Sequence, residues 1–229
     1  KQEIYSLSFE KGYYERPLLG AKNIPVRGGN RDYTVTVQNT DVLSIDIDLS
    51  SPIDMGNLVV KPKQKGETTI TVKDNVTNET VDLKIKIVDS YLNLKVAHPA
   101  QVPYTGGENL FFINNSDRDF YLFDEKMEKK ECTGNYQFLI KNSTCYMILN
   151  FDKELNDKRT YEYNISNTSE RMFTLIEILL GIDWNMKADL INRSTRSASP
   201  VTMNAVDTET NIIQYFVAGS NDIPENILD

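Results

Sequence analysis

The chain has 229 residues, a net charge of −8 and a pI near 4.8, and hydrophobic residues make up 40% of it. That apolar content builds packed cores and excludes a disordered chain, and the length suits two domains of roughly 90 and 140 residues. An acidic chain repels nucleic-acid phosphates and anionic membranes, so we expect neither as a partner. Abundant Val, Ile, Thr, Tyr and Phe, with few amphipathic helical patterns, predict a mainly β protein.

The first part of the chain alternates apolar and polar side chains with a period of two. The segments that carry this pattern are 33–37, 42–48, 58–62, 68–72 and 81–87. Gly, Asn and Asp residues typical of turns separate them. Short antiparallel strands at this spacing predict a β-sandwich of about seven strands.

Two of these segments resemble bacterial Ig-like group 2 domains. Residues 38–45 read QNTDVLSI, similar to the SNPDVATV stretch of that family, and residues 56–72 read GNLVVKPKQKGETTITV, similar to its GVVTAKKAGTATITV ending. The resemblance covers residues 1–89, and it departs from the family in lacking the Trp that often stands before these motifs. It implies an Ig-like sandwich of the kind used as adhesive or spacer modules in cell-surface proteins.

The second part of the chain carries a new alternation. The first pattern ends at Val88 and the next begins at Tyr91, so we predict an Ig-like β-sandwich over residues 1–89 and a β-rich C-terminal domain over residues 90–229. The apolar segments of the second domain are 91–96, 110–113, 120–123, 136–140, 146–151, 161–165, 201–206 and 212–217. Their order predicts an antiparallel β-meander, either a small barrel or a sandwich. Residues 169–183 fit a helix or a buried strand pair, and the helix is favoured.

No set of residues predicts catalysis, a metal site or a cofactor. His98 is the only histidine, which excludes a His-rich zinc site, and no Gly-x-Ser-x-Gly nucleophile motif occurs. Residues 105–108 are too short for a phosphate-binding loop and include an acid. We therefore expect no catalytic residues, no metal ligands and no cofactor.

Aromatic residues are the candidates for ligand binding. Trp184 follows Asp183 and suits stacking on a sugar ring beside an acid, whereas a core position is the alternative. Tyr104 and Tyr91, with the pair at 13–14, suit an exposed aromatic platform for a glycan or a protein partner, and packing on a sheet is again the alternative.

Export is expected from several features. Cys132 and Cys145 flank a predicted strand and either form a disulfide in an oxidising compartment or stay as two buried thiols. No apolar run approaches the roughly 20 residues of a membrane-spanning helix. The chain does not begin with Met, so we expect a processed protein, attached to a membrane only through a lipid anchor upstream of residue 1.

Together these features favour a non-catalytic cell-surface protein, an outer-membrane lipoprotein of a Gram-negative bacterium. Its Ig-like domain would act as a spacer for a C-terminal domain that binds an extracellular glycan or protein. One alternative is a lipocalin-like carrier of a small apolar ligand, which requires an apolar cavity. Another is an accessory domain of a polysaccharide hydrolase, or a hydrolase with Asp183 or Glu177 as its acid.

Overall fold

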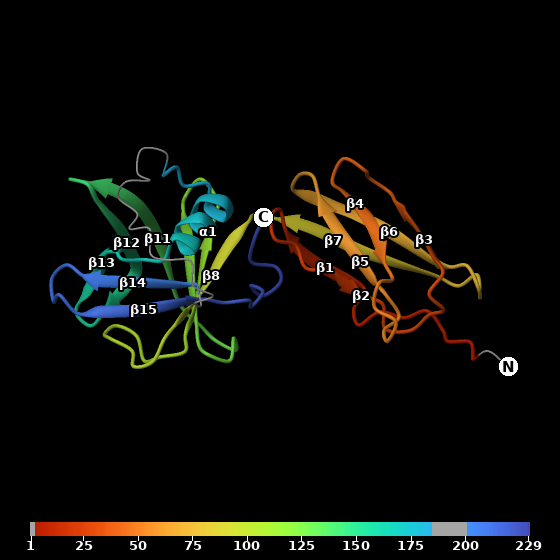
Figure 1. Cartoon of the computed structure of the whole chain (residues 1–229), viewed down its shortest axis with the longest axis horizontal. Helices are drawn as coiled ribbons and strands as arrows, with labels where there is room; N and C mark the ends of the chain where they lie inside the picture. Colours follow the sequence, from red (N-terminus) through yellow and green to blue (C-terminus); the bar gives the residue numbers. More distant parts are fainter. Residues whose placement is uncertain (1–2, 185–200) are drawn as a thin grey trace. The chain divides into compact units, whose positions relative to one another are not determined.

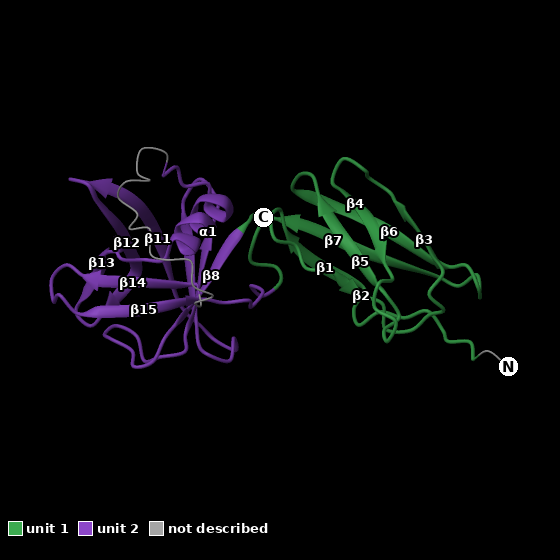
Figure 2. Cartoon of the chain, in the orientation of Figure 1, with its two compact units in different colours: residues 1–90, 225–229 green, residues 91–224 purple. Residues whose placement is uncertain are grey.

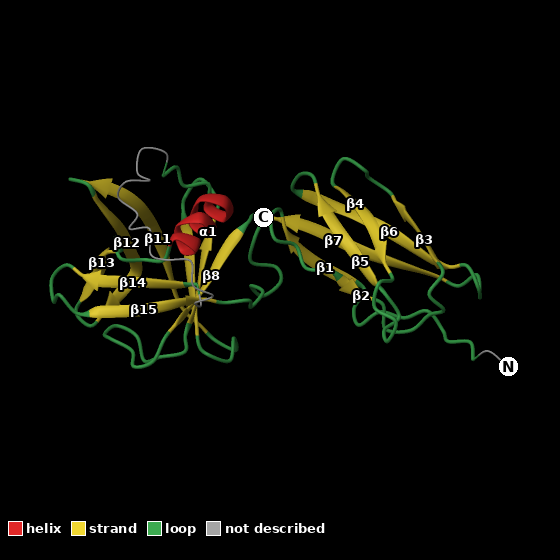
Figure 3. Ribbon diagram, in the orientation of Figure 1, coloured by secondary structure: helices red, strands yellow, loops and turns green. Residues whose placement is uncertain are grey.

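The computed structural model describes residues 3–184 and 201–229 (Figure 1). The chain divides into two compact units, and Figure 2 shows them in different colours. Unit 1 comprises Lys1–Ser90 and Glu225–Asp229, and unit 2 comprises Tyr91–Pro224. Strands are the main regular structure of both units, so the predicted mainly β fold is confirmed (Figure 3).

Unit 1 is a sandwich of two sheets. Its strands are β1 (Tyr13–Pro17), β2 (Ile24–Pro25), β3 (Tyr33–Val37), β4 (Leu43–Asp48), β5 (Asn57–Pro62), β6 (Gly66–Asp74) and β7 (Thr80–Val88). One sheet has the order β1-β7-β6-β3 and the other β2-β5-β4. All neighbouring strands are antiparallel except β1 and β7, which are parallel. Unit 1 is therefore a β-sandwich of seven strands, the number that the alternation predicts.

The core of unit 1 is mostly aliphatic. Alternate residues of the central strands, such as Ile70, Val72, Leu83 and Ile85, are fully buried between the two sheets. Their polar neighbours along the strands face solvent, as expected for sheets with one solvated side.

The last five residues belong to unit 1, although the sequence analysis places them in the second domain. Leu228 is buried, and its carbonyl accepts a hydrogen bond of 2.9 Å from the Lys86 ammonium. The backbone N–H of Asn226 donates to a carboxylate oxygen of Glu15 at 3.0 Å. The segment carries no strand periodicity, because hydrogen bonds of its backbone rather than an apolar pattern hold it.

Unit 2 is a closed eight-stranded barrel. Its strands are β8 (Tyr91–Val96), β9 (Asn109–Ile113), β10 (Asp119–Phe123), β11 (Lys130–Lys141), β12 (Thr144–Leu155), β13 (Lys158–Asn164), β14 (Thr202–Asp207) and β15 (Ile213–Ala218). Each strand pairs antiparallel with the next, and β15 pairs with β8 to close the barrel. Of the two predicted architectures, the structure therefore adopts the barrel.

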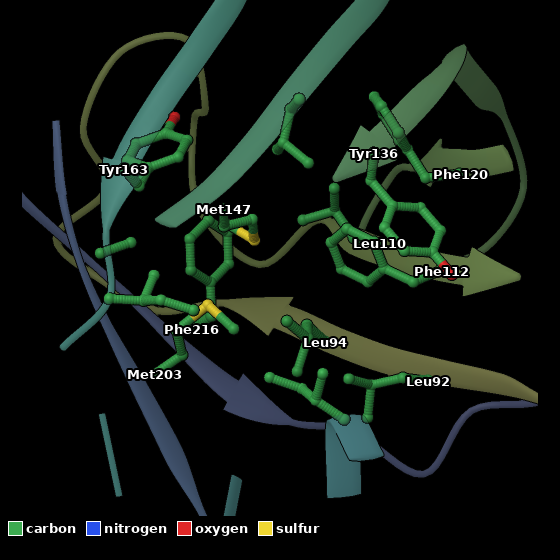
Figure 4. Close-up of a cluster of buried hydrophobic side chains, with 14 of the residues drawn as sticks. Leu92, Leu94, Leu110, Phe112, Phe120, Tyr136, Met147, Tyr163, Met203 and Phe216 are labelled. Atoms are coloured by element: carbon green, nitrogen blue, oxygen red, sulfur yellow. The ribbon is translucent and has the colours of Figure 1, made fainter. Parts of the chain in front are cut away.

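Side chains fill the barrel interior, as Figure 4 shows for Leu94, Phe112, Met147 and Phe216. These residues come from different strands and are fully buried. Edge-to-face ring contacts connect much of the interior, including that between Phe112 and Tyr136 at 5.1 Å. The interior is therefore a packed aromatic core, unlike the aliphatic core of unit 1.

The one α-helix of the described residues, α1 (Glu170–Leu180), lies between β13 and β14. Ser169 caps its N-terminus by accepting a hydrogen bond from the Met172 N–H, and Gly181 ends it in the left-handed conformation with φ of 64°. Its buried face, which includes Phe173 and Ile176, joins the barrel core. The helix predicted at 169–183 is therefore confirmed. Within the described residues, no helix has the length and apolar character needed to cross a membrane.

Candidate functional site

The barrel of unit 2 has two different ends. In an up-and-down barrel, alternate connections lie at the same end. The helix end therefore carries the β9–β10 turn, the β11–β12 turn and the β13–β14 connection with α1. The hairpin end carries the β8–β9, β10–β11, β12–β13 and β14–β15 connections. Because β8 begins and β15 ends at the helix end, the chain enters and leaves unit 2 there.

Trp184 belongs to the core at the helix end. It is 5% exposed, and its indole N–H donates to the Phe173 carbonyl at 3.1 Å. Its ring meets Phe173 edge to face with centroids 5.2 Å apart, and Phe138 at 6.3 Å. Trp184 was a candidate for stacking on a sugar ring, but both its ring and its N–H donor are engaged by the protein's own core.

Arg118 ties the β9–β10 turn to the end of α1. Its guanidinium donates to the Asn114 side chain at 3.1 Å, to the Tyr136 hydroxyl at 3.3 Å and to the Leu180 carbonyl. Tyr136 in turn donates to the Ile113 carbonyl at 2.8 Å. The polar groups at this end thus satisfy one another and hold the helix on the barrel.

Tyr104 and Tyr91 do not form a shared platform. Tyr104 is 6% exposed, its ring packs on Phe216 at 5.5 Å, and burial raises its pKa well above the ordinary value. Tyr91 is half-buried against Phe111 at 5.8 Å. No ring contact among the described residues joins these tyrosines to each other or to Trp184. Of the pair at 13–14, Tyr14 is buried in unit 1.

Cys132 and Cys145 are not joined to each other, so the possible disulfide is not formed. Cys145 lies opposite Ile140 in the β11–β12 pairing, eight residues further along β11 than Cys132. At about 3.3 Å per residue this separation is on the order of 25 Å, whereas bridged Cα atoms lie within about 7 Å. Both thiols are buried, and burial raises the pKa of Cys132 to about 11.

A pocket of about 230 Å³ opens at the hairpin end. Its lining comes from three of the connections there and from the strands beside them: Gln101, Val102, Asn156, Lys158, Tyr161, Tyr163, Asp207, Thr210, Ile212 and Gln214. β13 and β14 pair through only two residues, Tyr163 with Asp207 and Asn164 with Val206. Next to this pairing the Thr208 backbone N–H donates to the Glu162 carbonyl at 3.1 Å, and both Tyr163 and Asp207 line the pocket.

Lys158 is held by the pocket's own groups. Its ammonium lies 4.2 Å from the centre of the Tyr161 ring, 2.9 Å from a Glu209 oxygen and 3.9 Å from Oδ2 of Asp207. Asp207 is also oriented by the turn, because its Oδ1 accepts the backbone N–H groups of Glu209 and Thr210 at 2.8 and 3.2 Å. One cation thus faces two carboxylates.

Tyr161 and Tyr163 form the buried wall of the pocket. They stack at 6.4 Å with an interplanar angle of 15°, and each is 1% exposed. The Tyr161 hydroxyl donates to the Leu155 carbonyl at 2.6 Å, and the Tyr163 hydroxyl reaches that of Tyr104 at 3.5 Å. Burial raises the pKa of both pocket tyrosines, so their hydroxyls stay protonated at neutral pH.

The rim of the pocket combines unpaired polar groups with exposed apolar ones. Among the described residues, the side-chain amides of Gln101 and Asn156 have no hydrogen-bond partner. Val102 is 57% exposed and Ile212 is 48% exposed. Ile213 and Tyr215 of β15 are exposed as well, but they alternate with the buried Gln214 and Phe216 and therefore face the outside of the barrel. The apolar surface of Val102 and Ile212, surrounded by polar groups, is typical of a binding site.

Glu177 and Asp183, the acids considered for a hydrolase, are exposed, whereas Trp184 is buried. Groups of three or more potential metal ligands are missing from the described part of the chain.

No protein-family model matches the chain, and no curated protein matches it. Two solved structures align with it at 12% sequence identity and a TM-score of 0.32, over 94% of this chain: the surface layer protein SbsC, domains 4–9, and the S-layer protein SbsC, domains 5–6. The chain spans 31% of the first and 97% of the second. A TM-score this low does not establish a shared fold.

The pocket residues were absent from the sequence-based candidates. They come from three separate connections, which only the closure of the barrel brings together. One signal was readable: Ile212 and Ile213 are adjacent at the start of a strand, so strict alternation leaves one of them without a place in the core.

Proposed function

We propose that this protein is a non-catalytic cell-surface binding protein that recognises an extracellular glycan through the hairpin-end pocket of its barrel. The observation that carries the proposal is the pocket itself, where free amides, a carboxylate and exposed aliphatic side chains surround a hollow of about 230 Å³. Sugars present hydroxyl groups and apolar C–H faces together, and these groups match that lining.

Unit 1 acts as a spacer in this proposal. The pocket lies at the end of unit 2 opposite to the end where the chain leads to unit 1. The mouth of the pocket is therefore at the end of unit 2 that does not carry the connection to unit 1. The resemblance of residues 1–89 to bacterial Ig-like group 2 domains supports the same role. Export to the surface of a Gram-negative cell and attachment there by a lipid anchor are part of this proposal.

A lipocalin-like carrier is less well supported. Such a carrier holds its ligand in an apolar cavity, whereas side chains such as Phe112, Met147 and Phe216 fill this barrel. The pocket at the hairpin end is also smaller than the roughly 300–1,000 Å³ of most small-molecule sites.

The test is a binding screen of the full chain against arrayed polysaccharides, mucins and matrix proteins. Each hit is repeated with Ile212→Ser at the pocket rim and with Ile178→Ser, an exposed isoleucine (54%) on α1 at the other end. We expect saturable glycan binding that Ile212→Ser weakens and Ile178→Ser leaves intact. Binding that resists Ile212→Ser, or that falls only with Ile178→Ser, would remove the pocket from the proposal.

A further inference from the structure

We infer that the hairpin-end pocket takes an uncharged sugar unit that carries a methyl group, an N-acetylhexosamine or a 6-deoxyhexose, and that it discriminates against uronic acids. The inference rests on the proposed glycan-binding function and names the ligand class for that same site. Three properties of the pocket lead to it: its size, its charge and its apolar rim.

The size of the pocket suits a single sugar unit. Its volume of about 230 Å³ lies below the range of most drug-sized ligand sites. The filled barrel core beneath it, which includes Tyr104 and Phe216 behind Tyr163, leaves no path to a larger chamber. We therefore expect the end of a glycan or one branch of it to enter, with the rest of the polymer outside.

The charge of the pocket disfavours an anion. Lys158 is the one cation among the described lining residues, and it is engaged by Glu209, Asp207 and the Tyr161 ring. An anionic sugar would have to compete with these partners while facing two carboxylates. A neutral sugar instead gains Oδ2 of Asp207 and the amide groups of Gln101 and Asn156 as hydrogen-bonding partners.

The apolar rim of the pocket favours a sugar that carries an apolar substituent. Val102 and Ile212 line the pocket and stay 57% and 48% exposed. The ring C–H face of a simple hexose covers only part of such aliphatic surface, and the hydroxyl groups beside that face lose hydration without gaining a hydrogen bond there. The methyl of an N-acetyl group or of a 6-deoxy carbon covers it favourably, and one methyl in an apolar site changes affinity by about 10-fold.

The inference is tested by ligand-observed saturation-transfer NMR on the full chain. The probes are matched pairs, N-acetylglucosamine against glucose and L-fucose against L-galactose, with glucuronic acid as the anion. We expect each methyl-bearing sugar to bind about 10-fold more tightly than its partner. The strongest saturation should fall on its methyl protons, and glucuronic acid should bind more weakly than glucose.

Two variants locate the effect. Ile212→Ser should bring the two members of each pair within about 2-fold of each other, whereas Ile178→Ser should preserve the difference. Gln101→Ala should weaken both members together, since the amide serves the hydroxyls they share. The hydrogen bonds of Ile212 in this turn use its backbone N–H and carbonyl, so the variant keeps the turn contacts of the wild type.

The contrary results separate this inference from the proposed function. Equal affinities within each pair, or tighter binding of glucuronic acid, would overturn the ligand class while leaving a sugar-binding pocket. No saturable signal from any saccharide would overturn the class and the glycan function together. Ile212-dependent binding of arrayed matrix proteins without saccharide binding would likewise overturn both and identify a protein-binding site.

Discussion

The two ends of the barrel use the same kinds of residues for different purposes. The helix end contains aromatic rings and hydrogen-bonding groups, those of Trp184, Tyr136 and Arg118. Their hydrogen-bond partners lie within the protein. At the hairpin end, Gln101 and Ile212 leave polar and apolar surface available. An aromatic or charged residue therefore indicates a binding site only where its ring or polar groups are not already engaged by other residues of the protein.

The largest effect is expected from removing Trp184. Trp184→Ala deletes two ring contacts and a buried hydrogen bond, so it should lower the free energy of unfolding by about 3–5 kcal/mol. Urea denaturation followed by far-UV circular dichroism measures the change. Trp184→Phe, which keeps a ring and loses the N–H donor, should cost less. A loss below about 1 kcal/mol for the alanine variant would contradict a core role.

Arg118→Ala should have the next largest effect. It leaves the Leu180 carbonyl and the Asn114 side chain without their donor, at a cost of about 2 kcal/mol. Arg118→Lys keeps the charge, but its ammonium ends one bond short of Nη1, the nitrogen that makes these contacts, so it should restore only part of the loss. If the lysine variant matched wild type, the account of a guanidinium clamp on α1 would be wrong.

The thiols report on the two ends separately, because Cys132 lies near the hairpin end of β11 and Cys145 near the helix end of β12. With a pKa of about 11 for Cys132, only about 0.1% of it is thiolate at pH 8, so alkylation should be slow and rise about tenfold per pH unit. Cys145, fully buried at the end that α1 covers, should react more slowly still. The folded protein is alkylated and the label at each cysteine is measured by mass spectrometry. Faster labelling of Cys145 than of Cys132 would show that the helix end opens more readily than the hairpin end.

The raised pKa of Cys132 also sets a direction for stability. The folded-state pKa lies above the ordinary value of 9.0, so the native state holds this proton more tightly than the unfolded chain. The contribution of the Cys132 thiol to the free energy of unfolding is complete below pH 9 and is lost as the pH rises through about 11. Cys132→Ser should flatten this part of the alkaline stability profile, and an unchanged profile would contradict the assignment.

The smallest stability changes are expected at the exposed isoleucines. Ile212→Ser and Ile178→Ser should each change the free energy of unfolding by about 0.5 kcal/mol or less, because both side chains are about half exposed. Their effects on glycan binding should nevertheless differ, with a loss only for Ile212→Ser. Equal glycan binding by the two variants would contradict the claim that only the hairpin end of the barrel binds the ligand.

Much of the fold followed from local pattern. The alternation predicted all eight barrel strands and most of the sandwich, and Ser169 with the spacing of Phe173, Ile176 and Leu180 predicted α1. Two sandwich strands were missed: β1, whose sequence YYERP does not alternate apolar and polar residues, and β2, whose two residues are too few to show alternation. Barrel closure was left open, since the pairing of β15 with β8 joins segments about 120 residues apart and leaves no mark on either one.

The site was harder to predict than the fold. Trp184 and Tyr104 were singled out for their chemistry, but burial decides whether a ring can meet a ligand, and a single sequence does not report burial of one aromatic residue. Gln101, Asn156 and Asp207 are ordinary turn or loop residues in the sequence. They become a candidate site only because three hairpin-end connections meet.

The central claim is that ligands bind at the hairpin end of the barrel, and isoleucine-methyl NMR of the full chain tests it most directly. Ile212 and Ile213 report on the hairpin end, and Ile178 and Ile182 report on the helix end. On titration with N-acetylglucosamine oligomers, we predict saturable shifts of the Ile212 and Ile213 methyl signals and unchanged signals from Ile178 and Ile182. Shifts at the helix-end or unit 1 isoleucines, with Ile212 and Ile213 unmoved, would contradict the account.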